Sequence, residues 1–174
     1  QPIQFLHGEM IRIFSLTLPA HDQGLLAKDA MKTWAEQMHR GTDPLNAFLD
    51  EIQAAIDFTI RQRLASADQL AVAGLSRGTM IAAHVAAKEP RISHLLGFSP
   101  LTTFRTVKEF KHLGTDPISP QYDLTHLAPL LSERHVKLFI GNEDTRVGTR
   151  ECFESAMSLV HHKKRRMCFS ELHI

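Results

Sequence analysis

The sequence contains few cysteines. Cys152 and Cys168 are its two cysteines in 174 residues. That number is too small for a disulfide framework, and the pair does not stand in a C-x-x-C spacing of the kind that binds zinc or carries redox chemistry. A reducing compartment therefore fits the sequence best.

Long apolar runs and an excess of one charge are also missing. No stretch approaches the roughly 18 apolar residues of a membrane-spanning helix, and the start of the sequence lacks the pattern of a signal peptide. Lys and Arg number 20 against 19 for Asp and Glu, so no net field favours nucleic acid or an anionic membrane. We expect a cytoplasmic protein without nucleic-acid or membrane partners.

What is present is typical of one soluble globular domain, with 43% hydrophobic and 22% charged residues. Residues 11–18 (IRIFSLTL) form a β-rich run that predicts a strand. Helix formers dominate residues 25–40. Asp43 and Pro44 predict the cap and the first position of a second helix. The apolar stripe of that helix consists of Leu45, Phe48, Leu49, Ile52, Ile56 and Ile60.

From residue 69 onward, short apolar runs alternate with helical stretches. Strands are expected at 69–75, 94–98, 135–140 and 167–174, and helices at 79–88 and 149–161. Residues 99–134 carry several Pro, Gly and Asp and indicate a long excursion with short helices. Strands that alternate with helices predict an α/β fold: a mostly parallel sheet with helices on both faces.

A Gly-x-Ser-x-Gly motif, Gly74-Leu75-Ser76-Arg77-Gly78, stands between an expected strand and an expected helix. In that context the motif is the nucleophile elbow, a sharp turn that lifts the serine hydroxyl above the sheet. Glycines at the flanking positions avoid collisions with neighbouring backbone. Ser76 is then the candidate nucleophile, and the backbone N–H of Arg77 the candidate oxyanion donor. The alternative is an ordinary strand-to-helix loop.

The chain resembles the α/β-hydrolase superfamily, in particular its dienelactone-hydrolase-like and prolyl-oligopeptidase-like serine hydrolases. The segments IRIFSLTLPAHD, LAVAGLSRG and FSELHI carry the resemblance, which covers the chain from about Ile11 to Ile174. It implies a Ser-His-Asp triad that cleaves a carboxylic ester or related small acyl compound with water, without a metal or other cofactor. It leaves open whether the protein is a homo-oligomer.

The resemblance also assigns the triad acid. In this superfamily the acid follows a strand downstream of the elbow, and Gly141-Asn142-Glu143-Asp144 follows the expected strand 135–140. Asp144 takes the acid position, where it would orient the catalytic histidine and stabilise the imidazolium. Glu143 is the neighbouring rival, and a turn aspartate at a strand end is the plainer alternative.

The histidine of the triad has no clear candidate. It should follow the last strand, so it lies beyond Ile174 or is His173, inside that strand. We expect His84 and His94 to be structural. Leu6-His7-Gly8 imitates an oxyanion motif, yet a parallel crossover needs about a dozen residues before the strand at 11–18. The expected domain, residues 1–174, is therefore a partial hydrolase core that lacks its first strands and the end after its last strand.

Within this domain, a helical cap-like segment at about 25–66 and the excursion at 99–134 would shape the acyl pocket. Trp34, Phe104 and Phe110 either line that pocket or pack in the core. Three other functions stay open: a peptidase or amidase with the same triad, a non-catalytic binding protein with a hydrolase fold, and a nucleic-acid binder through the basic run 163–166.

Overall fold

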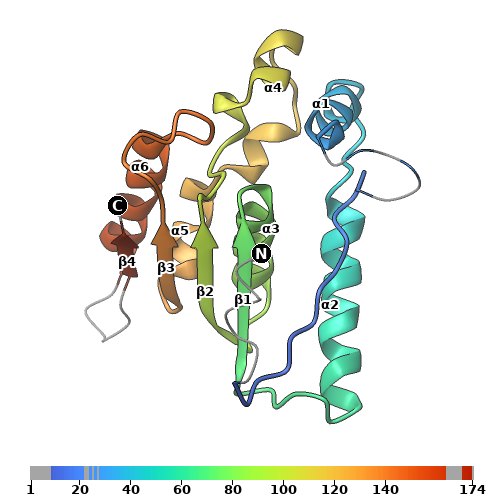
Figure 1. Cartoon of the computed structure of the whole chain (residues 1–174), viewed down its shortest axis with the longest axis vertical. Helices are drawn as coiled ribbons and strands as arrows, with labels where there is room; N and C mark the ends of the chain where they lie inside the picture. The colour runs from blue at the N-terminus through green and yellow to red at the C-terminus, as the bar shows by residue number, and fades with distance from the viewer. Residues whose placement is uncertain (1–8, 22–23, 25, 27, 164–169, 174) are drawn as a thin grey trace.

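The chain forms a four-stranded parallel sheet, and helices connect each strand to the next along the sequence (Figure 1). The computed structural model describes residues 9–21, 24, 26, 28–163 and 170–173. The strands are β1 (Leu70–Leu75), β2 (Ile92–Phe98), β3 (His135–Phe139) and β4 (Ser170–His173), in the spatial order β1-β2-β3-β4. All three strand pairs are parallel. The predicted α/β class with a parallel sheet is confirmed.

Two long helices make the crossovers at either end of the sheet. Helix α3 (Arg77–Lys88) joins β1 to β2, and α6 (Thr149–His162) joins β3 to β4. Before the sheet come α1 (Ala30–His39) and α2 (Asn46–Arg61). The excursion between β2 and β3 holds short helices, as expected: η2 (Phe104–Thr106), α4 (Lys108–Leu113), η3 (Ser119–Tyr122), η4 (Leu124–Leu127) and α5 (Ala128–Leu131).

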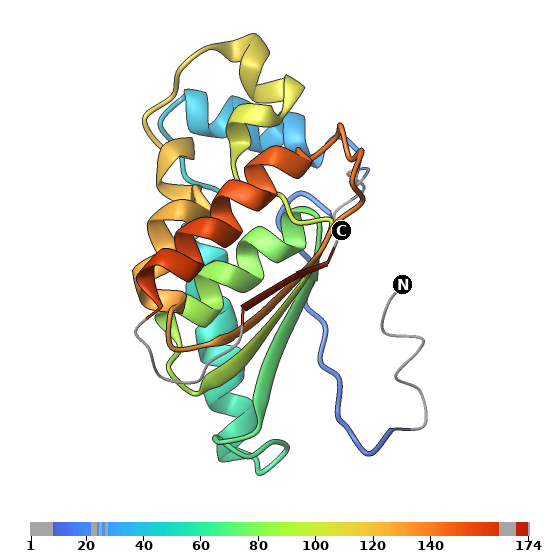
Figure 2. The same ribbon diagram turned by 90° about the vertical axis from the view of Figure 1, so that its left-hand side faces the viewer.

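The described helices lie on one face of the sheet, which corrects the expectation of helices on both faces (Figure 2). On the covered face Leu95, Val136 and Leu138 are buried. The opposite face carries Leu75, which is 54% exposed, and a row in which Phe98 stacks on Phe139 with ring centroids 5.1 Å apart. Side chains alternate between the two faces of a strand, so the covering layer buries every second residue.

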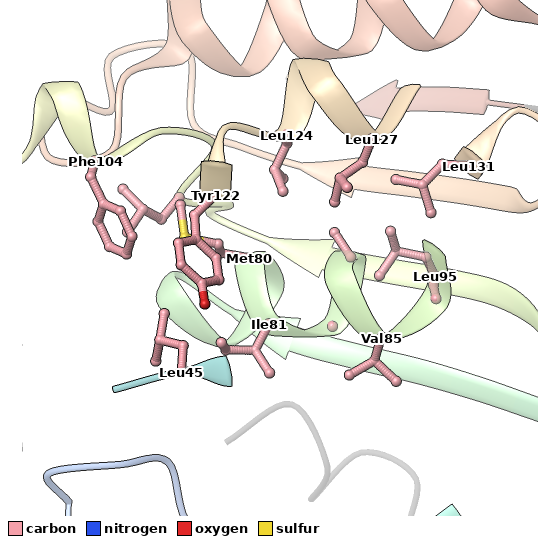
Figure 3. Packing of buried hydrophobic residues seen from close by; sticks show 14 of the residues in the cluster. Leu45, Met80, Ile81, Val85, Leu95, Phe104, Tyr122, Leu124, Leu127 and Leu131 are labelled. Atoms are coloured by element: carbon pink, nitrogen blue, oxygen red, sulfur yellow. The ribbon is translucent and has the colours of Figure 1, made fainter. Parts of the chain in front are cut away.

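The core fills the space between the sheet, α2, α3 and the excursion (Figure 3). Met80, Ile81 and Val85 of α3 face this space, and Tyr122 and Leu124 of the excursion close it from the other side. Trp34, Phe104 and Phe110 belong to the same buried cluster. Of the two alternatives for these three aromatics, the structure gives core packing rather than a pocket lining.

The predicted strand at 11–18 is not formed. The segment is extended but is assigned to no strand, and Ile11, Phe14 and Leu16 are each half exposed or more. Arg12 ties it to the body of the protein through a 2.7 Å hydrogen bond from Nη1 to the Leu64 carbonyl. A strand needs a hydrogen-bonded neighbour, and within the described residues this segment has no paired strand.

Two helix starts differ from the prediction. Helix α1 begins at Ala30 rather than near residue 25. Helix α2 begins at Asn46, and Asp43 accepts hydrogen bonds at Oδ1 from the N–H groups of Leu45 (2.9 Å) and Asn46 (3.2 Å). The N-cap residue of α2 is Leu45, so Asp43 binds these N–H groups from a position two residues before the cap. No helix in the described part of the chain combines the length and apolarity that crossing a membrane takes.

Candidate active site

Ser76 occupies a strained turn between β1 and α3. Its φ is 55° and its ψ −120°, a backbone conformation that residues with a side chain rarely adopt. Such a conformation costs about 1–3 kcal/mol, persists only where the surroundings enforce it, and is concentrated at functional sites. Ser76 is partly exposed at the carboxyl edge of the sheet.

The surroundings that enforce this turn begin with Gly74. A Cβ on Gly74 would lie 2.2 Å from the carbonyl carbon and oxygen of Gly78, so only glycine fits there. A Cβ on Gly78 would meet nothing within 4 Å. Gly74 therefore leaves no room for a side chain, whereas Gly78 matters through its backbone, which packs against Gly74.

Hydrogen bonds tie the turn to the neighbouring strand. The Ser76 N–H donates to the Phe98 carbonyl (2.8 Å), and the Ser76 carbonyl accepts from Leu101 N–H (3.2 Å). Arg77 is the first residue of α3, and the N–H groups of a first helical turn have no acceptor within the helix. That end of α3 also carries the positive end of the helix dipole, which favours a developing negative charge.

Asp144 lies in the loop after β3. Its Oδ1 accepts from the N–H groups of Arg146 (3.0 Å) and Val147 (3.1 Å), and its own N–H donates to Thr149 Oγ1 (3.1 Å). Among the described residues no hydrogen bond reaches Oδ2. The carboxylate is fixed by one oxygen and has the other available, whereas its rival Glu143 is an exposed side chain.

Ser76 and Asp144 follow strands of the same parallel sheet. Leu75, Phe98 and Phe139 form one row across β1, β2 and β3, so the turn with Ser76 and the loop with Asp144 leave the sheet at the same carboxyl edge. One strand, β2, lies between them, which corresponds to a separation of roughly 10 Å between their strands. An imidazole can bridge a gap of this order when it enters from a third segment.

His173 does not stand near Ser76. It lies in β4, three strand positions from β1 and hence roughly 14 Å from Leu75 across the sheet. Its ring stacks on Phe139 with centroids 4.6 Å apart, and its side chain is exposed on the open face. The sequence-based doubt about His173 is consistent with this placement.

Two histidines that we expected to be structural are engaged elsewhere. His84 belongs to α3, where it is buried, and its ring packs on the Tyr122 ring with centroids 4.9 Å apart. Burial is the main cause that lowers its pKa from 6.5 to about 4. His94 stacks on His135 at 4.6 Å on the open face of the sheet. Leu6-His7-Gly8 and the basic residues 164–166 lie outside the described residues.

The sequence interpretation did not single out His21. Its Nδ1 lies 2.9 Å from the Pro19 carbonyl, and its ring is 6.3 Å from the ring of Trp34. Arg77, directly after Ser76, places its Cζ 6.0 Å from the same indole. His21 therefore shares a packing partner with the neighbour of the candidate nucleophile. The only signal for it in the sequence is its place just after the β-rich run at 11–18.

Two hollows open near the carboxyl edge. One, of about 360 Å³, lies between η2, α4 and α6 and is lined by Thr103, Arg105, Thr106, Lys111, Arg150, Glu151 and Glu154. The other, of about 520 Å³, lies between α1 and α4 and is lined by Lys28, Asp29, Lys32, Lys108, Glu109 and His112. Ser76 and Asp144 line neither. Within the described chain no cluster of three or more His, Cys, Asp or Glu is arranged to hold a metal ion.

Comparison with known proteins adds a fold relationship. No protein-family model and no curated protein matches the sequence. Among solved structures, the chain is similar to a candidate carboxylesterase from Lactobacillus plantarum WCFS1, with a TM-score of 0.55 and 11% sequence identity. The match covers 72% of this chain and 55% of that one, so the chain spans little more than half the length of that protein. The likeness is one of fold and agrees with the α/β class of the parallel sheet and its helices.

Proposed function

We propose that this chain is the core of a serine hydrolase that cleaves a carboxylic ester or related acyl compound. The observation that carries the proposal is the backbone of Ser76, held at φ 55° and ψ −120° between β1 and α3. In a nucleophile elbow, such a strained turn exposes the serine hydroxyl at the edge of the sheet, where it can attack a substrate.

The reaction uses each group at the carboxyl edge in a defined way. Ser76 attacks the carbonyl, and a histidine accepts its proton and later returns it to the leaving group. Asp144 orients that histidine through Oδ2, because Oδ1 is occupied by two backbone N–H groups. The Arg77 N–H stabilises the oxyanion of the tetrahedral intermediate. Water then hydrolyses the acyl-enzyme, and the reaction calls for no metal or organic cofactor.

The first test is covalent labelling. A fluorophosphonate probe reacts with serines that a base activates, so we expect it to label the wild-type protein and to fail with Ser76→Ala. Ser99→Ala is a matched control, since Ser99 directly follows the neighbouring strand β2 and also has a positive φ, of 41°. Labelling that persists in Ser76→Ala, or that is absent from the wild type, would contradict the proposal.

The same assay can locate the histidine. His21→Gln and His173→Gln are compared for labelling rate, and the variant that loses the base should lose most of the labelling. A rate that neither substitution changes assigns the base to another residue. A labelled ester tested beside a labelled peptide separates an esterase from the peptidase or amidase that the same residues could support. A folded wild type that turns over neither would favour the non-catalytic binding protein.

A further inference from the structure

Two histidines meet on the open face of the sheet, away from the candidate active site. His94 of β2 and His135 of β3 are direct partners in the parallel register. Their rings are stacked, with centroids 4.6 Å apart and planes inclined by 14°. His94 is exposed and His135 is partly exposed. Because His94 lies four residues before Phe98, the last residue of β2, the pair is roughly 13 Å along the strand from the edge that carries Ser76.

A chain of hydrogen bonds fixes which ring nitrogen of His94 carries the proton. The Ser93 hydroxyl donates to the Leu70 carbonyl (3.2 Å), and the same hydroxyl oxygen lies 2.8 Å from His94 Nδ1. Because the hydroxyl proton is directed to Leu70, the Ser93 oxygen accepts a hydrogen bond from Nδ1–H. A neutral imidazole with its proton on Nδ1 has a lone pair on Nε2. Nε2 of His94 is therefore the nitrogen that can bind a metal ion.

This arrangement matches the surroundings of metal-binding histidines. A histidine that binds a metal ion through one nitrogen almost always donates its other ring N–H to a nearby acceptor, which orients the ring. Ser93 is that acceptor for His94. Within the described part of the chain no hydrogen bond occupies either ring nitrogen of His135, so one nitrogen from each ring is available to the same ion.

The spacing of the two rings also suits a shared ion. Zn–N bonds of about 2.0–2.1 Å and a tetrahedral angle put two ligand nitrogens roughly 3.3 Å apart. The ring centroids of His94 and His135 are 4.6 Å apart, so a small rotation of each ring about its Cβ–Cγ bond brings the nitrogens to that separation. Neither ring is buried, which leaves room for the rotation. Imidazole is a ligand of Zn²⁺, Ni²⁺ and Cu²⁺, whereas Mg²⁺ and Ca²⁺ take oxygen ligands.

We propose that His94 and His135 together bind one divalent transition-metal ion, such as Zn²⁺ or Ni²⁺, on the open face of the sheet. The two imidazoles are the protein ligands and water fills the other positions, since the described residues bring no group of three or more His, Cys, Asp or Glu together for a metal. The ion joins β2 to β3 and stabilises the folded chain. The site uses neither Ser76 nor Asp144, so it goes beyond the proposed hydrolase function.

Calorimetric titration of the purified protein with Zn²⁺ and with Ni²⁺ tests the proposal. His94→Phe and His135→Phe keep an aromatic ring for stacking but have no ligand nitrogen. Each should weaken the strongest binding step by more than about tenfold, because even residues that only orient a metal ligand contribute that much. His161→Phe is the control and should bind as the wild type does, since His161 is exposed at the end of α6. Mg²⁺ should not compete for the site.

Melting temperature separates a metal site from simple stacking. Zn²⁺ should raise the melting temperature of the wild type and of His161→Phe, but not that of His94→Phe or His135→Phe. Ser93→Ala keeps both imidazoles and removes only the acceptor of the Nδ1–H, so it should bind Zn²⁺ about ten- to a hundredfold more weakly. Binding and stabilisation that survive in either Phe variant would overturn the proposal and leave His94 and His135 as an ordinary stacked pair across two strands.

Discussion

The hydroxyl of Thr79 donates a 2.7 Å hydrogen bond to the carbonyl oxygen of Gly74. This bond joins the residue three positions after Ser76 to the residue two positions before it, and so closes the turn that carries the candidate nucleophile. Thr79 is fully buried, and its methyl group fills the space that the absent side chain of Gly97 leaves on β2. The strained Ser76 backbone is thus held by side-chain and backbone contacts on both strands next to it.

Thr79→Val should loosen this turn. Valine has nearly the same shape but leaves the Gly74 carbonyl without its hydroxyl donor, which should lower the free energy of unfolding by about 1–3 kcal/mol. The labelling rate of Ser76 by fluorophosphonate should fall as well. Thr79→Ser keeps the hydroxyl and loses the methyl, so it should keep the labelling rate at some loss of stability. Equal labelling of Thr79→Val and the wild type would show that the bond does not hold Ser76.

The two glycines of the motif should respond differently to alanine. Gly74→Ala forces a Cβ against the Gly78 backbone, where no flexible side chain can move away, and should cost roughly 3 kcal/mol or more. Gly78→Ala adds a methyl group in open space within α3 and should change stability by less than about 1 kcal/mol, in the stabilising direction. Urea unfolding of both variants checks this, and equal losses would contradict it.

A buried carboxylate far from the site should govern stability in acid. Glu89 is 1% exposed and is bonded to Arg91, which also pairs with Asp57 of α2, and to Gln53. The hydrogen bonds from Arg91 lower the pKa of Glu89 from 4.5 to about 2. A lowered folded-state pKa stabilises the protein above the unfolded value, and this stabilisation is lost as pH falls from 4.5 to about 2.

Glu89→Gln removes the charge and should lower the free energy of unfolding at pH 7 by about 3 kcal/mol. It should also flatten the pH dependence of stability in the acid window just described. Asp57→Asn is the matched control: Asp57 is 39% exposed, so its substitution should cost under about 1 kcal/mol. Urea unfolding measured between pH 7 and pH 2.5 distinguishes the two variants. Similar losses of unfolding free energy in both would contradict the prediction that the buried Glu89 contributes more to stability than the exposed Asp57.

His84 should make stability depend on pH in a higher pH range than Glu89 does. Its folded-state pKa of about 4 lies below the ordinary value of 6.5, so the unfolded chain binds a proton that the folded chain resists. The free energy of unfolding should therefore decrease as pH falls from 6.5 to 4. His84→Phe keeps a ring against Tyr122 and cannot titrate, so it should remove this decrease, which amounts to at most about 3 kcal/mol.

Denaturant midpoints measured at several pH values between 7 and 4 check the effect of His84→Phe. His161→Phe, at the end of α6, serves as the control because His161 is exposed. A decrease that persists in His84→Phe would mean that another group takes up the proton.

Sequence patterns predicted well where a segment's own composition decides its structure. The runs that became β1, β2 and β3 are short and apolar, and their observed bounds lie within two residues of the expected ones. The run at 11–18 has an equally β-rich composition and forms no strand. Composition sets the preference of a segment for an extended backbone, whereas a strand also needs a partner, and a partner is a property of the assembled fold.

From residue 69 onward the sequence alone determined the order of the strands and long helices, the sharp turn at Ser76 and the position of Asp144 after β3. These features follow from local periodicity and from glycine's lack of a Cβ. The tertiary structure decided that Thr79 closes the turn, that Arg77 rests on Trp34, and that His173 stands three strands from β1. Those relationships join segments distant in the chain. They depend on strand register and on packing between layers, which no single stretch of sequence contains.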